Sequence, residues 1–86
     1  MPQLSNEAIY ILRKLYGWNR IGNKYINMHD VIRIFPKRLR NRKLFKEWIR
    51  ELLRADLIII HKNGECTSLN KHKLGEIEAF SSVAIL

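Results

Sequence analysis

The sequence predicts one α+β domain, mostly α, in which three helices precede a β-hairpin and a fourth helix follows it. Three observations predict this class. The chain has 86 residues, enough for one hydrophobic core. Apolar residues recur at helical spacing through its first half. An aliphatic run, Leu57–Ile60, is followed by Asn63-Gly64, the preferred pair for a two-residue hairpin turn, and by a return strand ending at Leu69. Residues 1–86 are therefore assigned to a single domain.

The first helix is predicted to begin at Ser5 or Asn6, because both residue types make good N-caps. Glu7 then falls in the first turn, where a negative charge interacts favourably with the helix dipole. Gly17 stands where a C′ residue belongs. The residues expected to face the core recur at helical spacing: Ala8, Ile11, Leu12 and Leu15.

Residues 18–26 have no clear period and are predicted to form an ordered loop, with a short strand near Lys24–Ile26 that pairs with the hairpin. Trp18 and Tyr25 lie in this loop. We expect them to anchor it. The alternative is that they stack on bases, as aromatic side chains do in RNA-binding proteins.

The second helix is predicted over Met28–Phe35, with Asn27 as its cap and Pro36 as its stop. Its expected core stripe is Met28, Val31, Ile32 and Phe35. The third helix is predicted over residues 42–55, with Asn41 as a plausible cap. Its apolar residues fill one face and are expected in the core: Leu44, Phe45, Trp48, Ile49, Leu52 and Leu53.

The turn fixes the register expected for the hairpin. A two-residue type I′ loop at Asn63-Gly64 pairs Lys62 with Glu65 and, further along, Ile58 with Leu69. One face, expected to be the core side, then carries Ile58, Ile60, Thr67 and Leu69. The opposite face carries His61, Cys66 and Ser68, which makes the thiol half-exposed.

The last helix is predicted from Lys71 to about Phe80, with Asn70 as its cap and with Leu74 and Ile77 facing inward. The remaining tail, residues 81–86, is apolar enough to pack on the core or on a second subunit.

Charge is concentrated in one stretch. The net charge is +8 and the sequence pI is about 10.1. Residues 37–54 hold eight of the sixteen Lys/Arg but only two of the eight Asp/Glu, so this stretch alone carries +6. Such an excess favours a polyanionic partner, which means DNA, RNA or an anionic membrane surface. A cationic helix face can also be a merely solvated surface, although charge that serves solubility would be spread more widely.

Several classes of protein find no support in the sequence. The single cysteine excludes an internal disulfide and fits a reducing, cytoplasmic setting; we see no signal peptide and no apolar run of transmembrane length. Twelve isoleucines and many Lys/Arg lean towards a thermophile or an AT-rich genome. His61 and Cys66, predicted cross-strand neighbours, are too few for structural zinc. No clustered acids, Gly-rich phosphate loop or triad is recognisable, so we expect no metal, no cofactor and no enzyme.

The order helix, helix, basic helix, hairpin, helix resembles the winged helix-turn-helix domains of archaeal and bacterial DNA-binding proteins, over nearly the whole chain. Its most telling stretch is Trp48 to Ile58, which looks like the end of a recognition helix leading into the first hairpin strand. Ala55-Asp56 stands where many members have a glycine, so the helix–strand junction is expected to differ slightly.

The resemblance implies that helix 42–55 enters the major groove and that the 57–69 hairpin acts as the wing. The candidate contacts in the helix and the preceding turn are Arg38, Arg40, Asn41, Arg42, Lys43, Lys46, Arg50 and Arg54. Those in the wing and its flanks are His61, Lys62, Asn63, Lys71 and Lys73. Two alternatives stay open: Arg38 and Arg40 neutralise the end of the second helix, or Asn41 serves as a helix cap instead of reading adenine.

We therefore expect a double-stranded-DNA-binding protein, acting as a transcriptional regulator or nucleoid-associated factor. A homodimer is expected through the C-terminal helix and tail, because Val83, Ala84, Ile85 and Leu86 have no obvious place in so small a core. Any small-molecule regulation would then need a pocket at the dimer interface. The alternative is an accessory subunit of a replication, transcription or ribosomal assembly, in which the same basic face binds RNA or an acidic protein.

Overall fold

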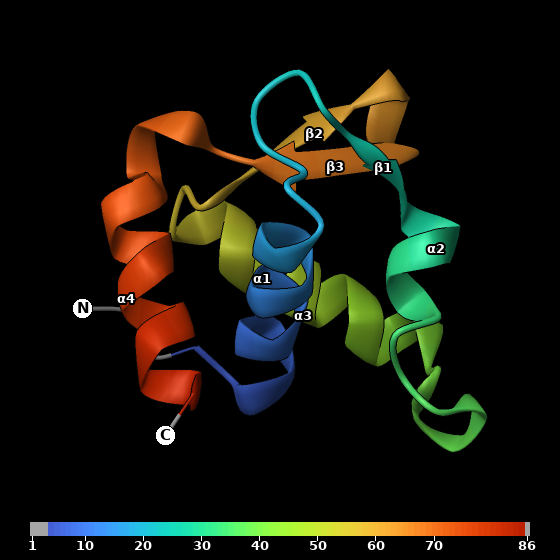
Figure 1. The fold of residues 1–86 in the computed structure, drawn as a ribbon. Coiled ribbons are helices and arrows are strands. Elements are labelled where there is room, and N and C mark those ends of the chain that lie inside the picture. The colour runs from blue at the N-terminus through green and yellow to red at the C-terminus, as the bar shows by residue number, and fades with distance from the viewer. Residues whose placement is uncertain (1–3, 86) are drawn as a thin grey trace.

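The structure, a computed structural model, describes residues 4–85 of the chain and the side chains of residues 4–80. It has the predicted α+β class, with four helices and a small antiparallel sheet (Figure 1). The elements follow in the order α1 (Asn6–Gly17), β1 (Ile26–Asn27), α2 (Met28–Ile32), α3 (Arg42–Arg54), β2 (Ile58–His61), β3 (Cys66–Leu69) and α4 (Leu74–Ile85). Short 3-10 turns precede α3 (Lys37–Leu39), close the hairpin (Lys62–Gly64) and precede α4 (Lys71–Lys73).

The three strands lie in the order β1-β3-β2, and both neighbouring pairs are antiparallel. The hairpin register is the predicted one from Ile58↔Leu69 to His61↔Cys66. The predicted Lys62–Glu65 strand pair is wrong, because Lys62 has a φ of 55° and Glu65 has helical dihedrals. The Asn63-Gly64 turn does form, with φ of 57° and 96°, closed by the Glu65 N–H donating to the Lys62 carbonyl at 3.1 Å.

The central strand β3 is buried along all four residues, which corrects the expectation of a half-exposed Cys66 and Ser68. The cause is the loop between α1 and β1, which folds back over the sheet. The Ser68 hydroxyl donates to the Gly22 carbonyl at 2.7 Å, and the Leu69 N–H donates to the Arg20 carbonyl at 2.8 Å. The predicted short strand also forms in this segment, at β1, where Ile26 pairs with Thr67.

Helix α1 begins as predicted and ends differently. Ser5 is the N-cap, its hydroxyl accepting from the Ala8 N–H at 3.2 Å, and the predicted core stripe is fully buried. Gly17 is not the C′ residue. Asn19 takes the left-handed conformation instead, with a φ of 57°. The Arg20 N–H donates to the Leu15 carbonyl at 3.0 Å, which is the long bond of a Schellman motif.

Helix α2 is shorter than predicted, because it ends at Ile32 and not at Phe35. Pro36 disfavours helical dihedrals at the residue before it, so the chain leaves the helix early through turns such as Phe35 N–H to the Ile32 carbonyl at 3.2 Å. Asn27 caps the helix as predicted. Phe35 is still buried, with its ring 4.8 Å from that of Trp48 on α3.

Helix α3 packs its predicted face on the core, with one correction at each edge of that face. Its buried residues are Phe45, Trp48, Ile49 and Leu52. Leu44 is 44% exposed and Leu53 is 41% exposed, although both were expected in the core. At the end of the helix, Asp56 takes the left-handed conformation, with a φ of 60°, that a glycine commonly supplies.

Helix α4 extends to Ile85, beyond the predicted end near Phe80, and packs along α1 (Figure 1). Asn70 caps the preceding turn, accepting from the His72 N–H at 3.0 Å, and Ile77 is fully buried as predicted. The side chains of Val83 to Leu86, which motivated the expected dimer, lie outside the described residues. Over residues 4–85, no helix combines the length and the apolar character that a membrane span requires.

Candidate nucleic-acid interface

The charges of α3 are segregated around the helix axis. At about 100° per residue, its five cations lie within an arc of roughly 120° opposite the core face, and Glu47 and Glu51 border this arc on one side, about 20° and 60° beyond Arg54. All five cationic side chains are exposed: Arg42, Lys43, Lys46, Arg50 and Arg54. The helix thus has a core face and an exposed face; most of the exposed face is a cationic flank formed by these five residues, and an acidic flank of Glu47 and Glu51 runs along one edge of it.

The cations of α3 have no acidic partner in this fold. Among the side chains of residues 4–80, the single ion pair within 4 Å joins Lys73 and Glu76, at 3.9 Å. Glu51 on the acidic flank is engaged elsewhere, since its carboxylate accepts from the Ser5 N–H at 2.7 Å and from the Ser5 hydroxyl at 2.8 Å. The five cations also outnumber the two carboxylates of the same helix, so the cationic flank keeps a net positive potential.

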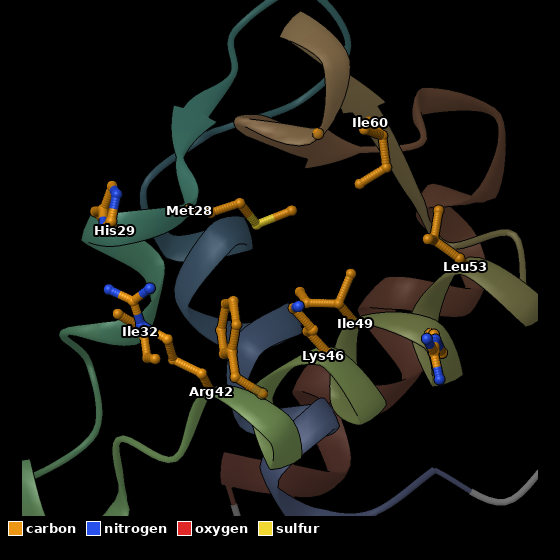
Figure 2. A pocket seen from close by; sticks show the side chains of 11 residues that line it. Met28, His29, Ile32, Arg42, Lys46, Ile49, Leu53 and Ile60 are labelled. Atoms are coloured by element: carbon orange, nitrogen blue, oxygen red, sulfur yellow. The ribbon is translucent and has the colours of Figure 1, made fainter.

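The cationic flank borders a groove of about 440 Å³ between α2, α3, β2 and the hairpin turn (Figure 2). Arg42, Lys46 and Arg50, at successive intervals of one helical turn, line it from α3, and His29 lines it from α2. Its remaining surface is largely aliphatic: Met28, Ile32, Ile49, Leu53 and Ile60. No described residue that lines the groove is acidic.

The sequence did not identify Met28, His29 or Leu53 as site residues. Leu53 lies at the edge of the apolar stripe of α3, and this edge position is the one signal in the sequence that pointed to its exposure. Met28 and His29 gave no such signal, because their place in the groove depends on how α2 packs against α3 and the hairpin.

The structure brings together only part of the predicted site. Gly64 lines the same groove as Arg42 and Lys46, so the hairpin turn and the cationic flank share one side of the molecule. The neighbouring turn residues Lys62 and Asn63 are exposed. Lys71 and Lys73 follow the far end of β3, one strand length away from the turn, and Lys73 is the residue paired with Glu76.

Two predicted contact residues hold the backbone instead. Arg40 Nε donates to the Phe35 carbonyl at 2.8 Å and Arg40 Nη2 to the Arg33 carbonyl at 3.3 Å, so this side chain satisfies carbonyls after α2, as one of the alternatives held. Asn41 Oδ1 accepts from the N–H groups of Lys43 at 2.9 Å and Leu44 at 3.2 Å. Arg38, on the turn before α3, remains exposed.

His61 and Tyr25 form a stacked pair at the base of the hairpin turn, with ring centroids 4.7 Å apart. His61 Nε2 lies 2.9 Å from the Ser68 hydroxyl. Because that hydroxyl gives its one proton to the Gly22 carbonyl, Nε2 must carry the proton in this contact. The Nζ of Lys62 lies 5.8 Å from the Tyr25 ring centroid. Tyr25 thus anchors the loop, as expected, and is still 37% exposed; Trp18 is 41% exposed.

His61 and Cys66 are paired across the two hairpin strands, as predicted. Nowhere in the described part of the chain do three His, Cys, Asp or Glu side chains gather in a group that could hold a metal ion.

Comparisons of the chain with protein-family models, with curated proteins and with solved structures found no match. The features that bear on function are therefore the charge of α3, the groove and the order of the elements.

Proposed function

We propose that this chain is a small winged-helix protein that binds double-stranded DNA, with α3 in the major groove and the β2–β3 hairpin as the wing. The order α1-β1-α2-α3-β2-β3-α4 supports this proposal, because α2 and α3 are consecutive helices, joined by nine residues that include a 3-10 turn, and the hairpin directly follows α3. The major groove is roughly 12 Å wide and admits one α-helix.

The observation that carries the proposal is the segregation of five unpaired cations on one flank of α3. A helix that used charge only for solubility would balance both signs and pair them at a spacing of three or four residues. Glu47 has this spacing to Lys43 and Arg50, and Glu51 has it to Arg54, but none of these pairs lies within 4 Å, and Glu51 binds Ser5 instead. A row of phosphates supplies the missing negative charge.

The individual roles follow from position along α3. Lys43, Lys46, Arg50 and Arg54 are suited to phosphates on either side of the groove, and Arg42, at the first turn, is suited to the O6 and N7 atoms of guanine. In Figure 2 the Arg42 side chain extends toward Ile32 on α2, so a base contact requires it to rotate outward. Lys62 at the turn supplies a further backbone contact.

Within this proposal the protein serves as a transcriptional regulator or nucleoid-associated factor in the cytoplasm and works as a homodimer through α4 and the C-terminal tail. Light scattering after size-exclusion chromatography tests the dimer. A clean monomer at micromolar concentration would count against it.

A second candidate function is an accessory module of a larger assembly that binds structured RNA or an acidic protein with the same flank. The exposed Trp18 and Tyr25 favour it, because aromatic side chains of this kind stack on unpaired bases.

Fluorescence anisotropy with a mixed-sequence DNA duplex and a matched RNA hairpin separates the two candidates. We expect the duplex to bind more tightly, and we expect the double variant Lys43→Gln/Lys46→Gln to lose roughly tenfold or more in duplex affinity. A variant with the same charge change on α1, Arg13→Gln/Lys14→Gln, is the control and should lose much less. Preference for the hairpin, or equal losses in both variants, would reject the proposed role of α3.

A further inference from the structure

The groove beside α3 has a chemical character that binding to a phosphate backbone does not explain. α3 contributes three cations to it, but six of its eleven lining residues are apolar, including the aromatic Phe45 and the 41% exposed Leu53. In Figure 2, Met28 from α2 and Ile60 from β2 point toward Ile49 and Leu53 of α3. A nucleic acid backbone needs the cations and gains little from this aliphatic surface.

We propose that this groove is a binding site for a small organic anion with an apolar body, such as a carboxylate on an aliphatic chain. The apolar body lies over Met28, Ile49, Leu53 and Ile60, where burial removes aliphatic surface from water. The anionic head pairs with Lys46, flanked by Arg42 and Arg50 at one helical turn on either side.

The size of the groove selects a small molecule over a protein segment. Its volume of about 440 Å³ lies within the usual range of small-molecule sites, roughly 300–1,000 Å³. One turn of an α-helix, about 10 Å across and 5.4 Å long, fills roughly 400 Å³ by itself. The groove therefore has room for one helical turn at most, whereas helix-in-groove partners engage through anchors spread over several turns.

The position of the site also has a consequence for DNA binding, and this consequence rests on the proposed function. Arg42, Lys46 and Arg50 line the groove and are also members of the cationic flank proposed to face DNA. A carboxylate bound in the groove offsets one of these three positive charges and excludes a phosphate from Lys46. The groove thus offers an effector site within one chain, whereas the sequence had led us to expect any such pocket only at a dimer interface.

The site is tested on the protein alone, by following its isoleucine, leucine and methionine methyl resonances during titration with octanoate. Octanol, with the same apolar body and no charge, and acetate, with the same head and no body, are the matched ligands. We expect saturable shifts confined to the groove residues, with a dissociation constant on the order of 1 mM for octanoate. Octanol should bind roughly threefold to fivefold more weakly, and acetate should leave the groove methyl groups unshifted.

Two variants test the assigned residues. Lys46→Met keeps the length of the side chain and removes its charge, and should weaken octanoate binding by a factor of roughly three to five. Leu53→Gln, at an exposed position that leaves no cavity, should weaken octanoate and octanol alike. Lys43→Met, on the same helix but outside the groove lining, is the control and should bind octanoate like the wild type.

Any of four results would overturn the site: octanol binding as tightly as octanoate, acetate reproducing the shifts, shifts spread over the whole surface, or an equal loss of octanoate affinity in Lys43→Met and Lys46→Met. Competition is measured separately, by adding octanoate to the DNA complex. Saturable octanoate binding without any DNA binding would leave the site established and refute only the proposed function. Failure of octanoate to bind a protein that does bind DNA would refute only the site.

Discussion

Asn41 offers a test of whether a residue at the start of α3 serves the helix or the ligand. Its Oδ1 accepts from two backbone N–H groups, those of Lys43 at 2.9 Å and Leu44 at 3.2 Å. These donors belong to the first turn of α3, where backbone N–H groups have no partner inside the helix. Asn41→Ala removes the acceptor, whereas Asn41→Asp keeps it and adds a negative charge that the helix N-terminus favours.

The expected size of the effect follows from the cap. Replacing an Asn N-cap by alanine costs about 1 kcal/mol, in a range of roughly 0.5–2 kcal/mol. For a domain of this length, 1 kcal/mol corresponds to a fall in Tm of roughly 4–8 °C. Asn41→Asp should match the wild type or exceed it slightly in Tm, since the acceptor geometry is preserved and the dipole interaction is added.

Circular dichroism during urea and thermal unfolding measures the free energy of unfolding and the Tm of the three proteins. The reasoning requires the alanine variant alone to be destabilised. If Asn41→Ala unfolded like the wild type, or if Asn41→Asp were as unstable as Asn41→Ala, the cap would be wrong and Asn41 would again be a candidate for base contact.

Two further predictions concern the contacts that join the helices. Glu51→Gln should lower the free energy of unfolding by about 1 kcal/mol, because a charged acceptor for the Ser5 N–H and hydroxyl is lost. In urea unfolding, the stability losses in Ser5→Ala and in Glu51→Gln should sum to more than the loss in the double variant. Strict additivity would show that the pair is not coupled. The Tyr16 hydroxyl donates to Glu78 at 2.7 Å, and this hydrogen bond, with burial and the carboxylate charge, raises the pKa of Tyr16 above 10.0. Because the pKa is raised in the folded state, the hydrogen bond should stabilise the fold below about pH 10, and this stabilisation should be lost as pH rises through the folded pKa. The stability difference between wild type and Tyr16→Phe should therefore vanish above that pH. A difference independent of pH would contradict this assignment.

Local chemistry made much of the fold predictable. The Asn63-Gly64 turn fixed the strand register because its two positive φ values permit few pairings. Side-chain caps at Ser5, Asn27 and Asn41 located the starts of three helices. The left-handed residues at the ends of α1 and α3 were missed, because Asn19 and Asp56 occupy positions for which a glycine is the usual signal.

Contacts between segments distant in sequence account for the remaining differences. The burial of Ser68 and Cys66 depends on the loop that folds back through Gly22, which no local pattern announces. The same limit applies to the site. The 100° spacing predicts a cationic face on α3, but only the packing of α2 and the hairpin shows that part of this face lines a groove.

The salt dependence of duplex binding tests the role of the cationic flank most directly. Lys43, Lys46, Arg50 and Arg54 of α3 together with Lys62 make five phosphate contacts, for which the slope of log K against log salt is roughly −4.5. Lys43→Gln/Lys46→Gln leaves three contacts and should reduce the slope to roughly −2.7, whereas Arg13→Gln/Lys14→Gln on α1 should leave it near that of the wild type. A slope near zero for the wild type, or one that changes equally in both variants, would contradict the assignment of α3 as the element that meets the nucleic acid.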